Sequence, residues 1–327
     1  MSAPDPLHPG AILAGKYRVE RVLGRGGMGV VVQAATIDGG QLRAIKLLTK
    51  AALKHPTAVE RFLREARATS GLHSEHVVRV LDVGALESGA PYMAMELLQG
   101  ADLATILKAR GVLTSFEAAR YVIQACHAIQ EAHDNGVIHR DLKPQNLFLV
   151  RRADGSTSLK VLDFGLSKAL APPPGADELT VTNTVIGSPA YMSPEQIRSA
   201  RSVDPRSDVW SLGVVLYLLV TGRLPFQSAN ASDMVALVVR GTPAPPSQLR
   251  PGLPHALDGV ILRCLEKIRP AASRAWPSWP PRSRPSRRRA RPRLHPMPGP
   301  RSRRAGVWGS SPSAWRPSSR WSSPCSP

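Results

Sequence analysis

Short apolar runs separated by glycine-rich or polar turns dominate the first third of the chain. Apolar and polar residues alternate over Tyr17–Leu23, which predicts a β-strand. Val30–Val32 and Leu42–Leu48 predict two more strands, and the sequence Asp-Gly-Gly at 38–40 predicts the turn between them. The other strands expected in this part are Val77–Val83 and Pro91–Leu97.

One amphipathic helix interrupts these strands. Apolar residues from Val59 to Ala66 recur at i, i+3, i+4 and i+7, the spacing of one helix face. Thr57 and Glu60 are three residues apart, so we expect a capping box at its start. Gly71 is expected to end it. We therefore expect residues 1–16 to be an irregular N-terminal lead-in, and the residues from 17 to 97 to form mostly strands with one helix.

From residue 98 the pattern becomes mainly helical. Thr114 and Glu117 form a second expected capping box, which opens a long amphipathic helix ending near Gly136. Asp208–Thr221 is apolar on nearly all sides, so it should be a buried helix. We find no internal repeat.

Composition changes abruptly after Lys267. The chain has 327 residues, with 43 Lys and Arg against 24 Asp and Glu. Residues 268–327 hold 14 of the arginines, 13 prolines and five of the six tryptophans, but no lysine or acidic residue. Such a segment has too few aliphatic residues to form a core, so we expect a disordered basic tail.

Several classes of protein are disfavoured. The three cysteines, Cys126, Cys264 and Cys325, lack metal or disulfide spacing, which argues against a secreted disulfide scaffold. The longest apolar run, Val214–Val220, is far shorter than a membrane span. The N-terminus lacks the basic-then-apolar pattern of a signal peptide. We therefore expect a cytoplasmic protein without a membrane segment.

A glycine cluster between the first two strands fits the pattern G-x-G-x-x-G-x-V over Gly24–Val31. Glycines there let backbone N–H groups approach phosphate oxygens closely. A glycine-rich hairpin is more often a simple turn, so this pattern alone is weak. Lys46 lies on the third expected strand among apolar neighbours, where its ammonium needs an anionic partner. Glu65 is the candidate; the alternative for Glu65 is a surface carboxylate paired with Arg61 or Arg64.

A more specific motif begins at His139. The sequence His139-Arg-Asp-Leu-Lys-Pro-Gln-Asn146 places Asp141 and Asn146 as in H-R-D-x-x-x-x-N. Asp163-Phe-Gly165 follows, and then Ser193-Pro-Glu195 stands where an A-P-E sequence is expected. By the order and spacing of these motifs, residues 17–267 resemble the bacterial eukaryotic-like serine/threonine protein kinase family.

The resemblance implies an α+β, bilobal protein kinase-like fold. A small β-rich N-lobe at 17–97 would precede a larger, mainly helical C-lobe at 98–267, and the tail at 268–327 would follow. It implies a serine/threonine kinase that transfers the γ-phosphoryl group of ATP to protein Ser/Thr hydroxyls, with Mg²⁺ or Mn²⁺. ATP and Ser/Thr-containing proteins would be its partners, with no specific nucleic acid, and the oligomeric state stays open.

The resemblance also assigns sites. Asp141 would orient the substrate hydroxyl and accept its proton. Lys143 would neutralise the charge that develops on the transferred phosphoryl group. Lys46 would hold the α- and β-phosphates of ATP and pair with Glu65. Asn146 and Asp163 would bind the metal. The residues implied in nucleotide binding are Gly24, Gly26, Gly29, Val31, Ala44, Lys46, Glu96, Leu98, Asp102, Asn146 and Asp163. Met95 is either the back of the adenine pocket or core packing, and Asp102 either reaches the ribose or caps the helix that begins at Leu103.

Regulation and substrate class rest on the same likeness. Lys143-Pro144 is typical of serine/threonine kinases, and Ser188 keeps the hydroxyl of a family threonine. Arg140 would pair with a phosphorylated activation loop, in which Thr182 and then Thr180 are the expected autophosphorylation sites. Otherwise these threonines are ordinary polar loop residues.

The likeness stops after Lys267, where the family continues with Asp-Pro, an arginine and a final helix. One added G before an ATC codon for Ile268 re-reads the next residues as Asp-Pro-Ala-Arg-Arg-Leu. We therefore hypothesise a shifted reading frame, so that the last C-lobe helices are missing here. Glu195 would then lack its arginine partner. One alternative to an active kinase is therefore a kinase-like protein that binds ATP but has weak or no activity. A less favoured alternative is a protein that binds nucleic acid or an acidic surface through its basic tail.

Overall fold

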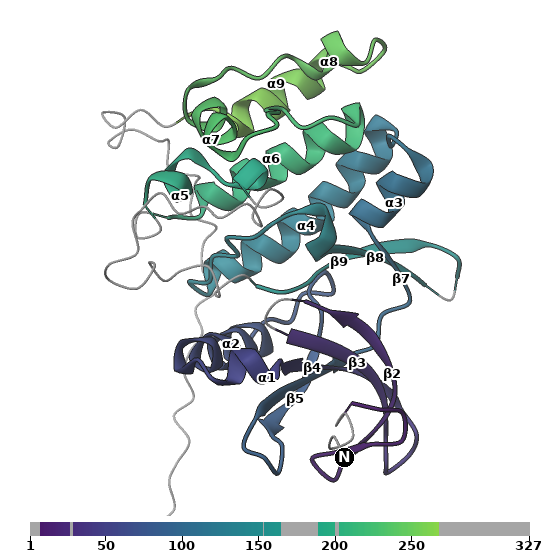
Figure 1. Cartoon of the computed structure of the whole chain (residues 1–327). Coiled ribbons are helices and arrows are strands. Elements are labelled where there is room, and N and C mark those ends of the chain that lie inside the picture. The colour runs from purple at the N-terminus through teal and green to yellow at the C-terminus, as the bar shows by residue number, and fades with distance from the viewer. Residues whose placement is uncertain (1–6, 27–28, 153, 165–188, 200–202, 268–327) are drawn as a thin grey trace, which may run out of the picture. The chain divides into compact units, whose positions relative to one another are not determined.

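The computed structural model describes residues 7–26, 29–152, 154–164, 189–199 and 203–267. All the elements below belong to the unit formed by residues 1–270. This unit has a small sheet lobe and a larger helical lobe, as expected (Figure 1). Among the described helices, none has both the length and the apolar character needed to cross a bilayer.

The small lobe is a six-stranded antiparallel sheet in the order β1-β2-β3-β4-β6-β5. Residues of β3 alternate between its faces, so Val30, Val32 and Ala34 lie at 3% exposure or less in the sheet's own core. Its strands are β1 Ile12–Leu13, β2 Tyr17–Arg25, β3 Gly29–Thr36, β4 Leu42–Leu48, β5 Val80–Ala85 and β6 Pro91–Glu96.

Two expectations for the small lobe need correction. The lead-in is partly ordered, because β1 pairs with β2 and buries Leu13. The fifth strand begins at Val80 rather than Val77, since Val77 instead forms a single parallel bridge with Val161 of the other lobe.

The helix of the small lobe begins differently from its expected start. After the short α1 (Lys50–Leu53), α2 spans Pro56–Ser70 and ends at Gly71. The expected capping box of Thr57 and Glu60 is wrong: His55 is the N-cap, with no side-chain bond, and the proline occupies the first helical turn. Helix α2 buries Phe62 and Ala66 beside Ala44 and Met93 of the sheet, and also buries Glu65.

The larger lobe combines a small sheet with helices packed around α6 (Figure 1). Its sheet has the order β7-β8-β9. The helices are α3 Leu103–Arg110, α4 Ser115–Asp134, α5 Pro194–Arg198, α6 Arg206–Thr221, α7 Ala231–Arg240, α8 Pro246–Leu249 and α9 His255–Cys264; the strands are β7 Gly100–Asp102, β8 Leu147–Arg151 and β9 Thr157–Val161; two 3₁₀ turns are η1 Pro144–Asn146 and η3 Pro189–Tyr191.

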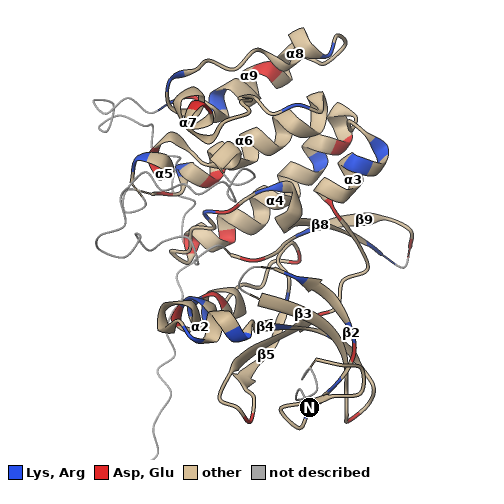
Figure 2. Ribbon diagram, in the orientation of Figure 1, with Lys and Arg blue, Asp and Glu red and all other residues tan. Residues whose placement is uncertain are grey.

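The two principal helices confirm their sequence patterns. The Thr114 hydroxyl accepts from the Glu117 N–H, and the Glu117 carboxylate accepts in return, so the capping box of α4 is present. Helix α6 is buried along most of its length and carries few charges (Figure 2). Its Gly213 allows α9 to approach, because a Cβ there would lie 2.5 Å from the Cβ of Cys264.

A single carboxylate ties the two ends of the small-lobe sheet together. Asp82 Oδ2 on β5 accepts from the Tyr17 hydroxyl at 2.9 Å, the Tyr92 hydroxyl at 2.8 Å and Lys16 Nζ at 3.0 Å. Because β2 and β5 lie far apart in strand order, these bonds require a strongly curled sheet. Burial raises the pKa of Asp82, but the donors outweigh it and hold the pKa below its ordinary value.

Replacing this carboxylate should loosen the small lobe. Asp82→Ala removes the acceptor of two phenols and an ammonium, so we expect the free energy of unfolding to fall by about 1–2 kcal/mol. Since the folded pKa lies below the unfolded one, the contribution is present above about pH 4 and is lost as pH falls through the folded pKa. Urea unfolding at pH 7 and pH 3 measures both effects. Glu87→Ala, in the exposed turn after β5, is the control; equal effects of both variants would contradict the assignment.

Candidate active site

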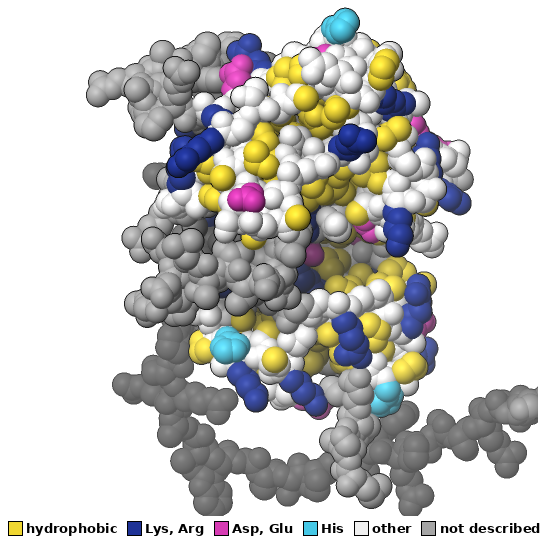
Figure 3. Space-filling model, turned by 45° about the horizontal axis from the view of Figure 1, so that its top comes forward, with side chains coloured by type: hydrophobic (Ala, Val, Ile, Leu, Met, Phe, Trp, Pro, Cys, Tyr) yellow, Lys and Arg dark blue, Asp and Glu magenta, His cyan; other side chains and the backbone are white. Residues whose placement is uncertain are grey.

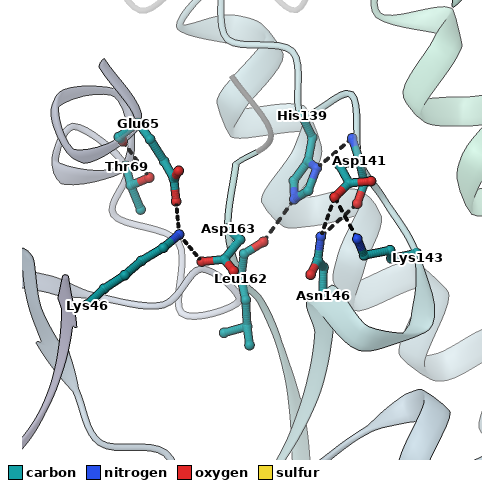
Figure 4. A network of polar contacts seen from close by, with 9 residues as sticks. All are labelled: Lys46, Glu65, Thr69, His139, Asp141, Lys143, Asn146, Leu162 and Asp163. Carbon is teal, nitrogen blue, oxygen red and sulfur yellow. Dashed lines mark hydrogen bonds and ion pairs between the residues drawn. The ribbon is translucent and has the colours of Figure 1, made fainter. Parts of the chain in front are cut away.

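Lys46 is the meeting point of three separate segments. Its Nζ on β4 lies 2.6 Å from Glu65 Oε1 of α2 and 2.8 Å from Asp163 Oδ1, which follows β9 (Figure 4). The Lys46 and Glu65 side chains are 15% and 8% exposed, while that of Asp163 is half exposed. Burial lowers the pKa of Lys46, but the two carboxylates outweigh it and raise the pKa above its ordinary value. Lys46 is therefore a fixed cation, and its expected partner Glu65 is confirmed over the arginine alternatives.

A second group forms around Asp141, in the loop after α4. Lys143 Nζ lies 2.8 Å from Asp141 Oδ2. Asn146 donates through Nδ2 to the Asp141 carbonyl at 2.8 Å and more weakly to Oδ2 at 3.3 Å. Asn146 ends the η1 turn, which brings its side chain back toward Asp141. The two donors leave the amide oxygen of Asn146 for another partner.

His139 joins the two groups. Its ring is fully buried and lies tilted against the Phe164 ring, with centroids 4.9 Å apart. Its Nε2 lies 3.0 Å from the Leu162 carbonyl oxygen (Figure 4). Nδ1 accepts from the Asp141 N–H at 3.3 Å, so the proton belongs on Nε2. Burial, the larger influence, lowers the pKa of His139 and keeps it neutral near pH 7. A neutral ring thus fixes the distance between the Asp141 loop and the residue before Asp163.

Sequence reasoning missed the carboxylate that anchors this loop. Asp208 of α6 is fully buried and accepts from the backbone N–H groups of His139 at 2.9 Å and Arg140 at 2.8 Å. His133 Nε2 of α4 lies 2.8 Å from Asp208 Oδ2. These bonds hold Arg140 at φ +67°, a conformation unfavourable for a side chain with Cβ. The available signal was an acidic residue at the start of an otherwise apolar helix, since a buried carboxylate must find donors.

The residues expected around the adenine lie in one apolar cluster. Ala44 and Met95 are buried in it, and Val31 and Leu98 pack against it, together with Phe62 and Ala66 of α2. Met95 is therefore part of a core as well as a candidate pocket wall. This cluster reaches Leu162, next to Asp163, and Figure 3 shows hydrophobic side chains along the hollow between the lobes.

The glycine cluster lies between β2 and β3, as expected. Gly24 is in β2, Gly29 begins β3, and the Gly26 N–H donates to the Gly29 carbonyl at 2.8 Å. A Cβ at Gly29 would lie 3.0 Å from the Leu47 carbonyl oxygen, so this position favours glycine. The two residues between, Gly27 and Met28, lie outside the described residues.

Two residues expected to bind the nucleotide, Glu96 and Asp102, have side chains that already bond to other parts of the protein. Glu96 Oε1 lies 2.8 Å from Lys160 Nζ of β9 and accepts from the Arg79 N–H. Its carboxylate thus fastens the connection between the lobes. Asp102 caps α3 by accepting from the Thr105 N–H at 2.9 Å and hydroxyl at 2.8 Å, so the capping alternative is observed.

The expected regulatory segment can be described only at its borders. Thr180, Thr182 and Ser188 lie outside the described residues. Arg140 Nε is buried and has no hydrogen-bond partner within the described chain. Glu195 accepts a hydrogen bond from the Ser207 hydroxyl of α6, at 2.8 Å from its Oε1. This neutral donor is not the arginine partner that Glu195 was expected to lack.

Comparison with known proteins agrees with this geometry. The model of the protein kinase domain matches residues 17–267. The chain belongs to the protein kinase family. Among curated relatives, the serine/threonine-protein kinase Pkn3 of Myxococcus xanthus is 40% identical over 282 residues, covering 84% of this chain and 51% of the relative. PknB of Mycobacterium tuberculosis is 38% identical over 258 residues, covering 78% and 40%.

A solved structure of a kinase is also similar. The crystal structure of the Mycobacterium tuberculosis PknI kinase domain, in a double-mutant form, matches with a TM-score of 0.61 and 26% identity. The match covers 80% of this chain and 91% of the PknI chain. These relatives confirm the expected bilobal fold and the kinase family. This kinase chain spans about half or less of the full length of Pkn3 and PknB.

Removing the Asp208 carboxylate should destabilise the loop that carries Asp141. Asp208→Ala leaves the backbone N–H groups of His139 and Arg140, and the His133 ring, without their acceptor, so we expect a loss of about 3 kcal/mol or more in unfolding free energy. Thermal denaturation measures it. Asp134→Asn, which alters an exposed side chain at the end of α4, should leave the melting temperature within about 1–2 °C of the parent. A parent-like melting temperature for Asp208→Ala would contradict the anchoring role.

Proposed function

We propose that this chain is an ATP-dependent serine/threonine protein kinase. The observation that carries the proposal is the convergence of two groups, Lys46–Glu65–Asp163 and Asp141–Lys143–Asn146, linked through His139 and the Leu162 carbonyl. The first group presents a fixed cation beside a carboxylate, and the second a carboxylate beside a cation. Phosphoryl transfer needs positioning and charge stabilisation of this kind more than covalent chemistry.

The small lobe supplies the nucleotide site in this proposal. Gly24, Gly26 and Gly29 cover the phosphates, and Lys46 holds the α- and β-phosphates while Glu65 orients it. The adenine lies against Val31, Ala44 and Leu98, all part of one apolar cluster. Backbone groups near Glu96 read the base, and Asp102 approaches the ribose from its capping position.

The proposed metal site uses Asp163 and Asn146. The amide of Asn146 spends its N–H donors on Asp141, which leaves its oxygen free to ligate. Asp163 adds a half-exposed carboxylate. Two protein oxygens fit Mg²⁺, which takes few protein ligands and completes its shell with phosphates and water, and Mn²⁺ would suit the same set. A bound ion would supply neutralisation of charge on the transferred phosphoryl group.

Asp141 and Lys143 carry the remaining roles. The Asp141 carboxylate orients the substrate hydroxyl and accepts its proton as the oxygen attacks the γ-phosphorus. Lys143, 2.8 Å from that carboxylate, neutralises the charge that develops on the moving phosphoryl group. His139 and Asp208 are positioning residues, because they hold the backbone of the loop.

The substrate class and regulation come from the relatives and the sequence. Serine/threonine specificity is supported by the names of the relatives and by Lys143-Pro144. Protein Ser/Thr hydroxyls are the proposed acceptors. Thr182 and Thr180 are the proposed autophosphorylation sites, and the unpartnered Nε of Arg140, among the described residues, supports a role in receiving that phosphate.

The Asp141 carboxylate should be essential for self-phosphorylation. With ATP and Mg²⁺, the parent chain should gain phosphate on Thr180 or Thr182, mapped by mass spectrometry. Asp141→Asn should lose at least about 100-fold in rate, because the general base contributes 10²–10⁴-fold. Chelation with EDTA should abolish labelling in the parent.

The matched control is Asp154→Asn, which changes an exposed carboxylate in the turn before β9. It should be labelled like the parent. Labelling of the Asp141→Asn variant at the parent rate, or none in folded parent protein, would refute the proposed activity.

A further inference from the structure

One lysine of the larger lobe bonds to two separate segments of the small lobe. Lys160 lies on β9, and its side chain is 16% exposed. Its Nζ lies 2.8 Å from Glu96 Oε1 at the end of β6. The same Nζ donates to the Val77 carbonyl at 3.1 Å, in the connection between α2 and β5. A partly buried ammonium needs such partners, but the proposed mechanism gives this lysine no role.

Glu96 is bonded to the small lobe as well as to Lys160. Its Oε1 also accepts from the Arg79 N–H at 2.7 Å, and the Glu96 N–H donates to the Arg79 carbonyl at 3.0 Å. Arg79 directly precedes β5, so these bonds join the start of β5 to the end of β6. Lys160 is therefore held to the ends of two neighbouring strands rather than to one free side chain.

The connection between α2 and β5 is itself fastened to the larger lobe. Glu131 of α4 accepts from the His73 N–H at 2.8 Å and from the Ser74 N–H at 2.7 Å. The Val161 N–H of β9 donates to the His76 carbonyl at 2.8 Å. These bonds fix the connection but do not involve Glu96. The pair of Lys160 with Glu96 adds the end of β6, where the chain crosses to the larger lobe, to the same fixed region.

The ion pair also links two parts of the proposed nucleotide site. Lys160 is three residues before Asp163 on the chain, and Glu96 begins the segment proposed to read the adenine. Release of a nucleotide from the hollow between the lobes (Figure 3) requires the lobes to move apart. Such a movement separates β9 from the end of β6. It therefore stretches or breaks the Lys160–Glu96 pair, at a cost in free energy.

We propose that Lys160 is a positioning residue that restrains the opening of the lobes and so slows the release of nucleotide. This inference rests on the proposed kinase function, because it concerns the nucleotide of that site. Lys160 contacts neither nucleotide nor substrate. It acts through Glu96, whose place decides where the segment that reads the base lies relative to the strand that leads to Asp163.

The rate of nucleotide release tests this directly. The full chain carries Asp141→Asn, so that it attaches no phosphate to itself. ADP with a fluorescent label on its ribose is bound in the presence of Mg²⁺ and then displaced by excess unlabelled ADP in a stopped-flow instrument. Lys160→Met should raise the dissociation rate about fivefold, because it removes one partly buried ion pair. Lys160→Arg should recover most of the slow release, since it restores a cation for Glu96.

A change on the partner residue checks that the two side chains act together. Glu96→Gln removes the charge of the partner and keeps its shape, so it should also speed release. The double variant should release ADP no faster than Lys160→Met alone. If Lys160→Met does not fold, Glu96→Gln carries the test, and an unchanged rate in that variant would overturn the proposal.

Lys108→Met is the matched control, since it removes an exposed lysine of α3. It should release ADP at the parent rate, and melting temperatures confirm that each variant is folded. An unchanged rate in folded Lys160→Met, even with a lowered melting temperature, would overturn the proposal in favour of a purely structural contact. Effects of Lys160→Met and Glu96→Gln that multiply in the double variant would overturn it too, since the residues would then act independently. If the parent binds no labelled ADP, the proposed function itself fails, and this inference fails with it.

Discussion

The sharing of one ammonium between two carboxylates is the constraint on which this active site depends. Lys46 comes from a strand, Glu65 from a helix and Asp163 from the other lobe, so no single element fixes their distances. A buried lysine without a partner is costly, and the pair with Glu65 holds α2 against the sheet. The bond to Asp163 then sets the small lobe against the large one. The proposed phosphate site is thus assembled only when both lobes and α2 are correctly placed.

The large lobe uses a different kind of anchor. Asp208 is a buried carboxylate that accepts from two backbone N–H groups and lies 2.8 Å from His133 Nε2. The backbone donors do not change protonation near neutral pH. Asp208 fixes the backbone at His139 and Arg140. The neutral His139 ring in turn bonds the Leu162 carbonyl and so fixes the backbone just before Asp163. Asp141 therefore projects from a loop whose geometry is decided by the buried core of α6. This explains how a loop with little regular structure can hold the carboxylate proposed to be catalytic.

Much of this arrangement could be predicted from the sequence, and the exceptions have physical causes. The pairing of Lys46 with Glu65 was predictable because an apolar strand and a helix face bring both charges inward. The capping box at Thr57 failed because Pro56 already favours the first helical turn and moves the start of α2. Asp208 and the Asp82 cluster were missed because their donors lie 69 and 65 residues away, beyond any local pattern. Ser207 was missed as the partner of Glu195 for a related reason, since a hydroxyl carries no sequence signature.

The central claim is that Lys46, held between its carboxylates, organises phosphoryl transfer to hydroxyl groups of serine and threonine. Its most direct test is phosphoamino-acid analysis after incubation of the chain with γ-labelled ATP, Mg²⁺ and a mixture of peptides that contain serine, threonine or tyrosine. The account predicts labelled phosphoserine and phosphothreonine from the parent, and a loss of about 100-fold or more in a folded Lys46→Met variant. Equal labelling by parent and variant, or label confined to tyrosine, would contradict it.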